Sequence, residues 1–221
     1  MTARWARFEL LTGALAVLAW LVGILIVEGS GDTGDDSAAA LLAYFENDEM
    51  SLYVGGSIFF IGSALLIWFA GTLRSVIAAT GLDRLASIAF GSAVALAVTS
   101  MALIAPQIGA AFGANESDAP LTAEAAQALW FAGDGFFVAS EFAAASLLAA
   151  VALAVLRSRM LPTWFAWLSL AIALVLIIPP IGWAALIFGL PIWILLVTYF
   201  LWRRTETTPA LPSAEPEAQV R

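Results

Sequence analysis

Residues 127–159 read QALWFAGDGFFVASEFAAASLLAAVALAVLRSR. Asp134 and Glu141 are the only ionisable residues in this stretch before it ends at Arg157 and Arg159. A long apolar segment bounded by basic residues is typical of a transmembrane helix, because about 20 helical residues cross a hydrocarbon core of about 30 Å. The stretch therefore predicts a membrane-spanning helix that carries two acidic side chains.

The rest of the chain repeats this pattern. The predicted spans are residues 10–27, 51–73, 85–106, 127–156, 161–178 and 182–202. With 62% hydrophobic residues and a mean hydropathy of +0.94, the 221 residues leave no room for a sizeable soluble domain. We expect an all-α, polytopic membrane helix bundle of six transmembrane helices over residues 1–204. Residues 205–221, rich in proline and glutamate, are expected to form a disordered cytoplasmic tail.

The basic residues predict the orientation of the bundle. The chain has nine basic residues, all arginine, and eight of them lie at alternate ends of the apolar segments: Arg4 and Arg7, Arg74 and Arg84, Arg157 and Arg159, Arg203 and Arg204. Because cytoplasmic loops carry the excess of basic residues, both termini are expected in the cytoplasm. The intervening loops hold most of the acidic residues behind the net charge of −8. An acidic outer face argues against nucleic acid as a partner.

The composition also excludes several kinds of chemistry. The chain contains no cysteine, histidine or lysine. Thiolate and imidazole ligands for zinc or haem, Schiff bases and Ser-His or Cys-His nucleophile pairs are therefore absent. We expect no metal site, no cofactor and no catalytic residues.

Local signals mark where helices begin. Ser37 is expected to cap a short amphipathic helix over residues 38–45 that lies on the membrane surface. Thr122 is expected to cap a helix that continues into the fourth span. The Pro-Pro-Ile-Gly turn at residues 179–182 leaves almost no loop, so the last two spans are predicted to be antiparallel neighbours.

Small and aromatic residues indicate packing within the bundle. Trp20 and Trp193 lie in mid-span and are interpreted as packing residues. Gly23 is expected to allow close helix approach, and so is a row of small residues in the third span: Ser87, Gly91, Ala95 and Thr99.

The two acidic residues of the fourth span are the candidates for a site, because a charge within a membrane is costly. Asp134 and Glu141 are seven residues apart, which puts both on one helix face. Glu141 lies 16 residues from Arg157, or about 24 Å at 1.5 Å per residue. Counting 16 residues from the arginines at the cytoplasmic ends of the second, third and sixth spans leads to a position next to Ser57, to Ser100 beside Thr99, and to Ile187. These residues are therefore predicted at the same depth as Glu141.

These residues predict a polar layer. Pro191 has no N–H, so the Ile187 carbonyl is expected to lack its helical partner, and Gly189 is expected to ease a hinge there. Glu141 is expected to be neutral and to donate a hydrogen bond into the layer. Asp134 and Gln107 are expected near the outer interface, with Asp134 ionised. The alternatives are that Glu141 is a structural polar residue and that Asp134 is an ordinary acid near a helix end.

Two stretches carry a resemblance to a known family. They are FAGTLR at residues 69–74 and LPTWFAW at residues 161–167, and the segment from Asp134 to Phe137 adds to them. The chain resembles a family of uncharacterised six-helix integral membrane proteins of actinobacteria, a domain of unknown function. The resemblance implies the cytoplasmic membrane of a bacterium and brings no activity or catalytic residues with it.

Three functional hypotheses follow. The favoured one is a non-catalytic binding or accessory protein with an outward-facing polar pocket, whose partner is another membrane protein or a small lipophilic ligand beside the membrane lipids. The second is a proton-coupled transporter of a small solute that uses Glu141. The third is a lipid-modifying enzyme with Asp134 and Glu141 as acid and base. The third is disfavoured by a rise of about 10.5 Å between the two acids.

Overall fold

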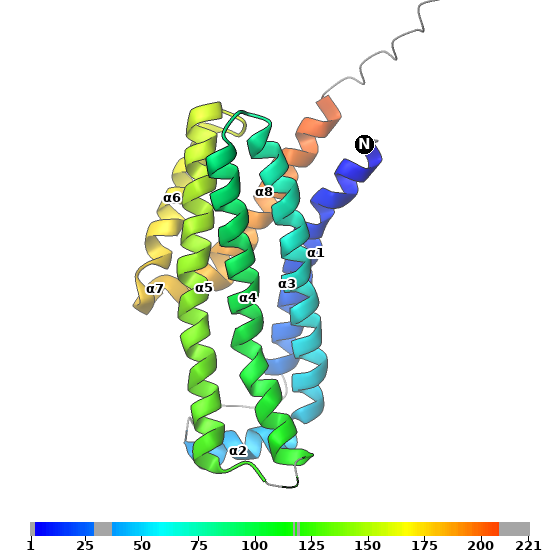
Figure 1. Cartoon of the computed structure of the whole chain (residues 1–221), viewed down its shortest axis with the longest axis vertical. Helices are drawn as coiled ribbons and strands as arrows, with labels where there is room; N and C mark the ends of the chain where they lie inside the picture. The colour runs from blue at the N-terminus through cyan, green and yellow to red at the C-terminus, as the bar shows by residue number, and fades with distance from the viewer. Residues whose placement is uncertain (1–2, 29–36, 117, 119, 208–221) are drawn as a thin grey trace, which may run out of the picture.

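A computed structural model describes residues 3–28, 37–116, 118 and 120–207, and the described chain is all helical (Figure 1). The helices are α1 (Ala3–Glu28), α2 (Ala38–Asn47), α3 (Glu49–Ala78), α4 (Asp83–Asn115), α5 (Ala123–Ser158), α6 (Thr163–Leu176), α7 (Pro179–Ala184), the π-helical turn η1 (Ala185–Gly189) and α8 (Leu190–Thr207). The predicted tail falls mainly on residues 208–221, which lie outside the described residues, while α8 itself continues to Thr207.

Five helical segments are long and apolar enough to cross a membrane. They are Phe8–Glu28, Glu49–Ala78, Asp83–Asn115, Ala123–Ser158 and Pro179–Arg204, the last of which joins α7, η1 and α8. The segment predicted at residues 161–178 contains a shorter helix, because α6 has only 14 residues. At 1.5 Å per residue α6 is about 21 Å long, less than the hydrocarbon thickness.

Because α6 is short, it lies beside only one half of the length of the bundle. From the end that carries the α5–α6 connection, α6 runs down beside α5, turns at α7 about halfway along the molecule, and α8 returns antiparallel to it (Figure 1). Helices α3, α4 and α5 continue past this turn, and α2 lies across their far ends (Figure 1). Helix α8 packs along α1 and contacts α6 through side chains such as Trp193 on Phe165, so the two segments meet, while their pairing as two membrane spans stays a prediction.

Side-chain caps begin two of the helices as predicted. The Ser37 side chain accepts a hydrogen bond from the Ala40 N–H (3.4 Å) at the start of α2, and Thr122 accepts one from the Ala125 N–H (3.2 Å) at the start of α5. Helix α2 buries Tyr44 against α5, where its ring meets Trp130 edge-on at 6.1 Å. The apolar face of α2 is therefore covered by the bundle.

Glycine lets α1 and α3 approach closely. A Cβ atom at Gly23 would lie 2.7 Å from the Gly55 carbonyl oxygen, and one at Gly55 would lie 2.8 Å from the Gly23 oxygen. The small row predicted on the third span was wrong as a packing face: Ser87, Gly91 and Ala95 are exposed on α4. The buried face of the same stretch instead includes Ala86, Ala89, Ala93 and Ala97, together with Leu85 and Leu96. Both faces are rich in small residues, so residue size did not distinguish them.

Two tryptophans connect neighbouring helices through the same combination of ring stacking and a hydrogen bond. On α8, Trp193 stacks on Phe165 (5.9 Å, 21°), and its N–H donates to the Ser169 hydroxyl (2.8 Å). On α1, Trp20 stacks on Phe59 in the same way (5.9 Å, 26°), and its N–H donates to the Ser63 hydroxyl (2.9 Å). Both were predicted to be packing residues, and both are buried.

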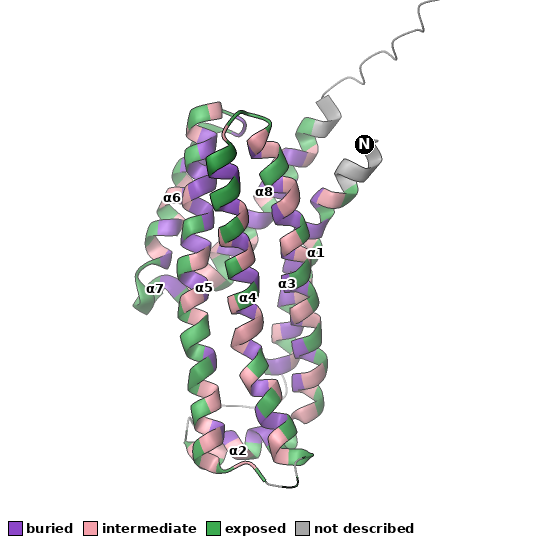
Figure 2. Ribbon diagram, viewed as in Figure 1, coloured by how far each residue is buried: buried purple, intermediate pink, exposed green. Residues whose placement is uncertain are grey.

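The outer surface of the bundle is apolar. Large side chains are exposed along the helices, among them Leu18 (58%), Trp68 (70%) and Leu174 (61%). Figure 2 shows buried residues on the inner sides of the helices and exposed ones on the outer sides. Soluble proteins rarely expose large continuous apolar surfaces. The apolar surface and the helix lengths are compatible with an integral membrane protein.

Candidate functional site

Glu141 lies in the middle of α5 and is buried, with 1% of its surface exposed. A Cβ atom built at Gly182 on α7 would be 2.7 Å from its Oε1 and 2.9 Å from its Cδ. The carboxyl group is therefore packed directly against the backbone of the α6–α7 turn. Its Oε2 atom is buried and has no hydrogen-bond partner among the described residues.

The sequence after α6 explains this contact. Ile178 is extended (φ −109°, ψ 90°), and Pro179 and Pro180 then begin α7, where missing N–H groups cost nothing. The next N–H groups, of Ile181 and Gly182, donate to the Ile178 carbonyl at 3.0 and 2.8 Å. The Ile181 and Gly182 N–H groups are thus hydrogen-bonded within the turn, and Gly182 packs against Glu141.

The predicted polar layer is only partly assembled. The hydroxyl of Ser140, next to Glu141, lies 2.9 Å from the Thr99 hydroxyl on α4 and 2.9 Å from the Phe136 carbonyl oxygen on α5, and its single proton is shared between these two acceptors. Thr99 in turn donates to the Ala95 carbonyl (2.9 Å), so these hydroxyls bond to one another and to backbone. The sequence reasoning did not single out Ser140, although its position next to a buried acid was an available signal.

The other predicted members are distributed around the bundle. Ser100 is buried on α4, whereas Ser57 is exposed on the surface of α3. Gln107 is buried further along α4, and its Nε2 atom would be 3.6 Å from a Cβ at Gly133 of α5. Ser57 therefore does not face the same interior as Glu141.

Asp134 and Glu141 differ in burial despite their spacing. Asp134 is exposed on α5, and Val138, which lies between the two acids, is 37% exposed. The seven-residue spacing puts both acids on one side of α5. Gly182 of α7 packs against Glu141, whereas Asp134 is exposed to the surroundings of the bundle. A shared environment for the two acids is not found.

The predicted hinge coincides with a change of helix type. Residues Ala185–Gly189 form a π-helical turn, and the Leu190 N–H donates to the Ala185 carbonyl, five residues earlier. Pro191 follows directly, and Ile187 is half-exposed within the turn. The wider turn is a local way to accommodate a proline without breaking the helix. Single π-turns of this kind are frequent at functional sites.

Two cavities open elsewhere. One of about 550 Å³ is lined by residues of the α5–α6 connection and the end of α8, including Arg159 and Arg203. The other, of about 340 Å³, is lined by Glu9 and by residues of α3 and α4 around Trp68 and Thr72. Glu141 lines neither. Within the described part of the chain, no three acidic side chains gather into a group that could hold a metal ion.

The chain matches no family model, and no curated protein or solved structure shows significant similarity to it. The described residues form an all-helical bundle whose longer helices are apolar enough to cross a membrane, and the buried carboxyl group of Glu141 has one oxygen atom without a hydrogen-bond partner among them.

Proposed function

We propose that this protein is a multi-pass protein of the bacterial cytoplasmic membrane, with six spans and both termini in the cytoplasm. The alternation of arginines supports the orientation. With the arginine ends at the cytoplasmic surface, a hydrocarbon core of about 30 Å ends about 20 residues along α5 from Arg157, near Phe137. The α6–α7 turn then lies at the outer edge of the core, and α2 lies outside it. The bacterial source is proposed from the family resemblance in residues 69–74 and 161–167 alone.

The absence of cysteine allows a direct test of the topology. Single variants Ser37→Cys, Ile181→Cys and Thr80→Cys place a thiol at exposed positions near α2, at the α6–α7 turn and after α3. In intact cells, a membrane-impermeant maleimide is expected to label the first two, and to label Thr80→Cys only after lysis. An Ile181→Cys thiol that is silent from both sides would show that α6 and α8 do not each cross.

Within this topology, the protein serves as a non-catalytic binding or accessory protein whose site is centred on Glu141. The observation that carries this proposal is the buried Oε2 atom without a partner. A neutral carboxyl fits an apolar interior, because an unpaired buried charge is costly, and it offers one donor and one acceptor. Its ligand is a small lipophilic molecule with a polar group, or a polar group of a partner helix.

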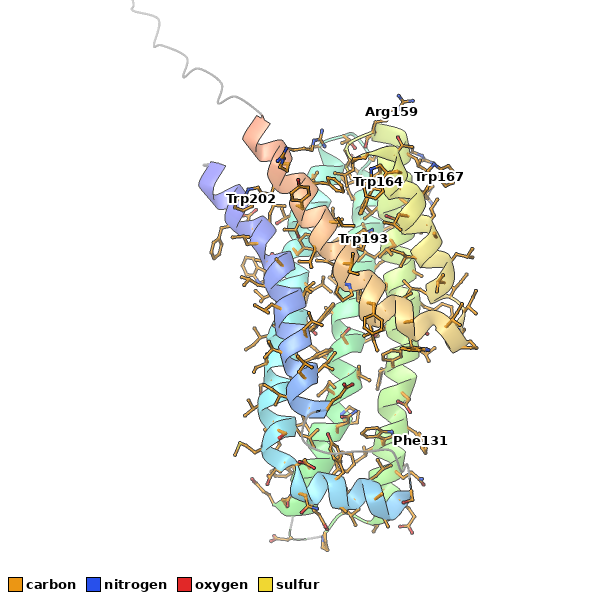
Figure 3. The ribbon with its side chains drawn as sticks, turned by 180° about the vertical axis from the view of Figure 1, so that it is seen from behind. Phe131, Arg159, Trp164, Trp167, Trp193 and Trp202 are labelled. Carbon is orange, nitrogen blue, oxygen red and sulfur yellow. The ribbon has the colours of Figure 1, made fainter. Side chains whose placement is uncertain are left out.

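Access is from the outer side. On the side of α5 that carries Glu141, apolar side chains are exposed further towards the start of the helix, including Phe131 (51%) and Val138 (37%). Figure 3 shows Phe131 on the half of the bundle away from Arg159. An apolar approach surface that leads to one buried polar group suits a lipophilic ligand.

Mass spectrometry of the protein purified from its native membrane tests this proposal. A bound molecule is expected with wild type and is expected to be lost in Glu141→Ala. Asp134→Asn, on the same helix but exposed, is the matched control and should retain it. Identical bound molecules in all three proteins would remove Glu141 from the site.

The π-helical turn that directly follows α7 favours a second candidate, a proton-coupled transporter of a small solute. In that mechanism Glu141 exchanges a proton while Gly189 and Pro191 allow α8 to move. Substrate-dependent proton uptake into proteoliposomes would be abolished in Glu141→Gln. A lipid-modifying activity is not proposed, because Asp134 and Glu141 occupy different environments.

A further inference from the structure

The larger cavity lies at the arginine-rich end of the bundle, away from Glu141. It has a volume of about 550 Å³, and its lining includes Arg159, Pro162, Thr163, Phe200, Arg203 and Arg204. Three of the residues that line it are basic and none is acidic. A concave site lined by three guanidinium groups is suited to an anion with several oxygen atoms.

The backbone holds these arginines in place. Arg159 ends α5 in the left-handed conformation (φ 54°, ψ 29°), a position that glycine usually occupies at the end of a helix. Arg204 donates a hydrogen bond to the Met160 carbonyl, which ties the end of α8 to the α5–α6 connection. Arg203 lies over the Tyr199 ring at 5.9 Å. Two separate helix ends thus bring their charges to one cavity.

The start of α6 adds to the positive potential. Pro162 precedes the helix and supplies no side-chain cap, and the first turn contains no acidic residue. The first N–H groups of α6 and its helix dipole therefore favour an anion at this end. Thr163, the first residue of α6, lines the cavity.

Aromatic residues place the cavity at the level of lipid headgroups. Trp164 and Trp167 on α6 are 53% and 62% exposed, and Trp164 meets Phe200 edge-on at 5.8 Å. Figure 3 shows both tryptophans at the same end of the bundle as Arg159 and Trp202. Tryptophan gathers where the hydrocarbon meets the headgroups, so an anion here is next to acyl chains as well as water.

We propose that this cavity binds the phosphate headgroup of an anionic phospholipid from the adjacent leaflet. The headgroup phosphate is held by Arg159, Arg203 and the start of α6, while the acyl chains run along the exposed apolar surface of α6. Basic pockets between helices on the cytoplasmic side recognise such lipids in this way. The inference needs the membrane setting but does not depend on a ligand at Glu141.

Lipid titrations of the purified full-length protein test the proposal. Native mass spectrometry in a neutral detergent compares phosphatidylglycerol, phosphatidylcholine and inorganic phosphate as ligands. Wild type is expected to prefer phosphatidylglycerol. Arg159→Gln and Arg203→Gln are each expected to weaken its binding about fivefold, as for one basic residue near an anionic headgroup. Arg204 is left in place because it also supports the Met160 carbonyl.

The chain offers a matched control at the same end of the bundle. Arg74 and Arg84 flank the α3–α4 connection, are exposed and do not line the cavity. The pair Arg74→Gln and Arg84→Gln, and separately Glu141→Gln, should keep wild-type affinity for phosphatidylglycerol. A loss in the Arg74→Gln and Arg84→Gln pair as large as in Arg159→Gln or Arg203→Gln, or equal binding of phosphatidylcholine, would overturn the proposal. Inorganic phosphate binding as tightly as the lipid would overturn it in favour of a soluble anion.

Discussion

The carboxyl group of Glu141 on α5 rests against the backbone of Gly182 on α7, so closely that a methyl group on Gly182 would lie 2.7 Å from Oε1. The Leu176 carbonyl oxygen would lie 2.9 Å from the same methyl group. Because glycine has no Cβ atom, the carboxyl group of Glu141 and the reversing chain between α6 and α7 can pack against each other at this position. This contact joins the candidate site to the α6–α7 turn.

Replacing this glycine is expected to destabilise the fold. Gly182→Ala should lower the free energy of unfolding by about 1–3 kcal/mol, because both the carboxyl and a backbone carbonyl must shift. Gly135→Ala on α5, where a Cβ meets nothing within 4 Å, should instead be neutral or stabilising by about 0.5–1 kcal/mol. Thermal unfolding in detergent measures both variants. Equal effects of the two substitutions would contradict the contact.

The protonation state of Glu141 is accessible to infrared spectroscopy. Because no described arginine lies near the middle of α5, we expect a neutral carboxyl group at pH 7 and its absorption band in wild-type protein. Glu141→Gln should remove that band, whereas Asp134→Asn should remove only carboxylate absorption. Loss of carboxylate absorption in Glu141→Gln would show that the buried group is ionised.

The hydroxyl pair Ser140 and Thr99 is expected to couple α5 to α4. A double-mutant cycle with Ser140→Ala and Thr99→Val should give a coupling energy of about 0.6 kcal/mol, as is usual for hydrogen bonds between helices in a membrane. Ser87→Ala, at an exposed position on α4, serves as the control and should show no coupling to Ser140→Ala. A cycle that closes to zero for the first pair would mean that the bond contributes nothing to stability.

The two tryptophan contacts should respond alike to substitution. Trp193→Phe and Trp20→Phe each remove a donor to a serine hydroxyl and part of a stacked ring, so each should cost about 1–2 kcal/mol of unfolding free energy. Trp167→Phe, at a 62% exposed position, should change it by less than about 0.5 kcal/mol. Equal stability of all three variants in the same unfolding assay would show that the two tryptophan contacts do not contribute to the free energy of unfolding.

Local signals were sufficient for much of the architecture. The caps at Ser37 and Thr122 were predictable because each depends on one side chain and an N–H three residues later. The apolar segments follow from hydropathy averaged over about 20 residues. The packing face of α4 was not predictable, because alanine, glycine and serine occur on both of its sides. The length of α6 was overestimated, because the apolar residues that follow Leu176 belong to the turn.

The order of residues by itself determined the apolar helices, their starts and the ends that carry arginine, since these depend on neighbours within a few turns of the chain. It also determined that Asp134 and Glu141 lie on one side of α5. Only the tertiary structure decided that one acid is buried and the other exposed, because burial depends on which part of α5 the chain around Gly182 packs against. The same holds for the arginine-lined cavity, whose charges come from two helix ends that are distant in sequence and meet only in the folded bundle.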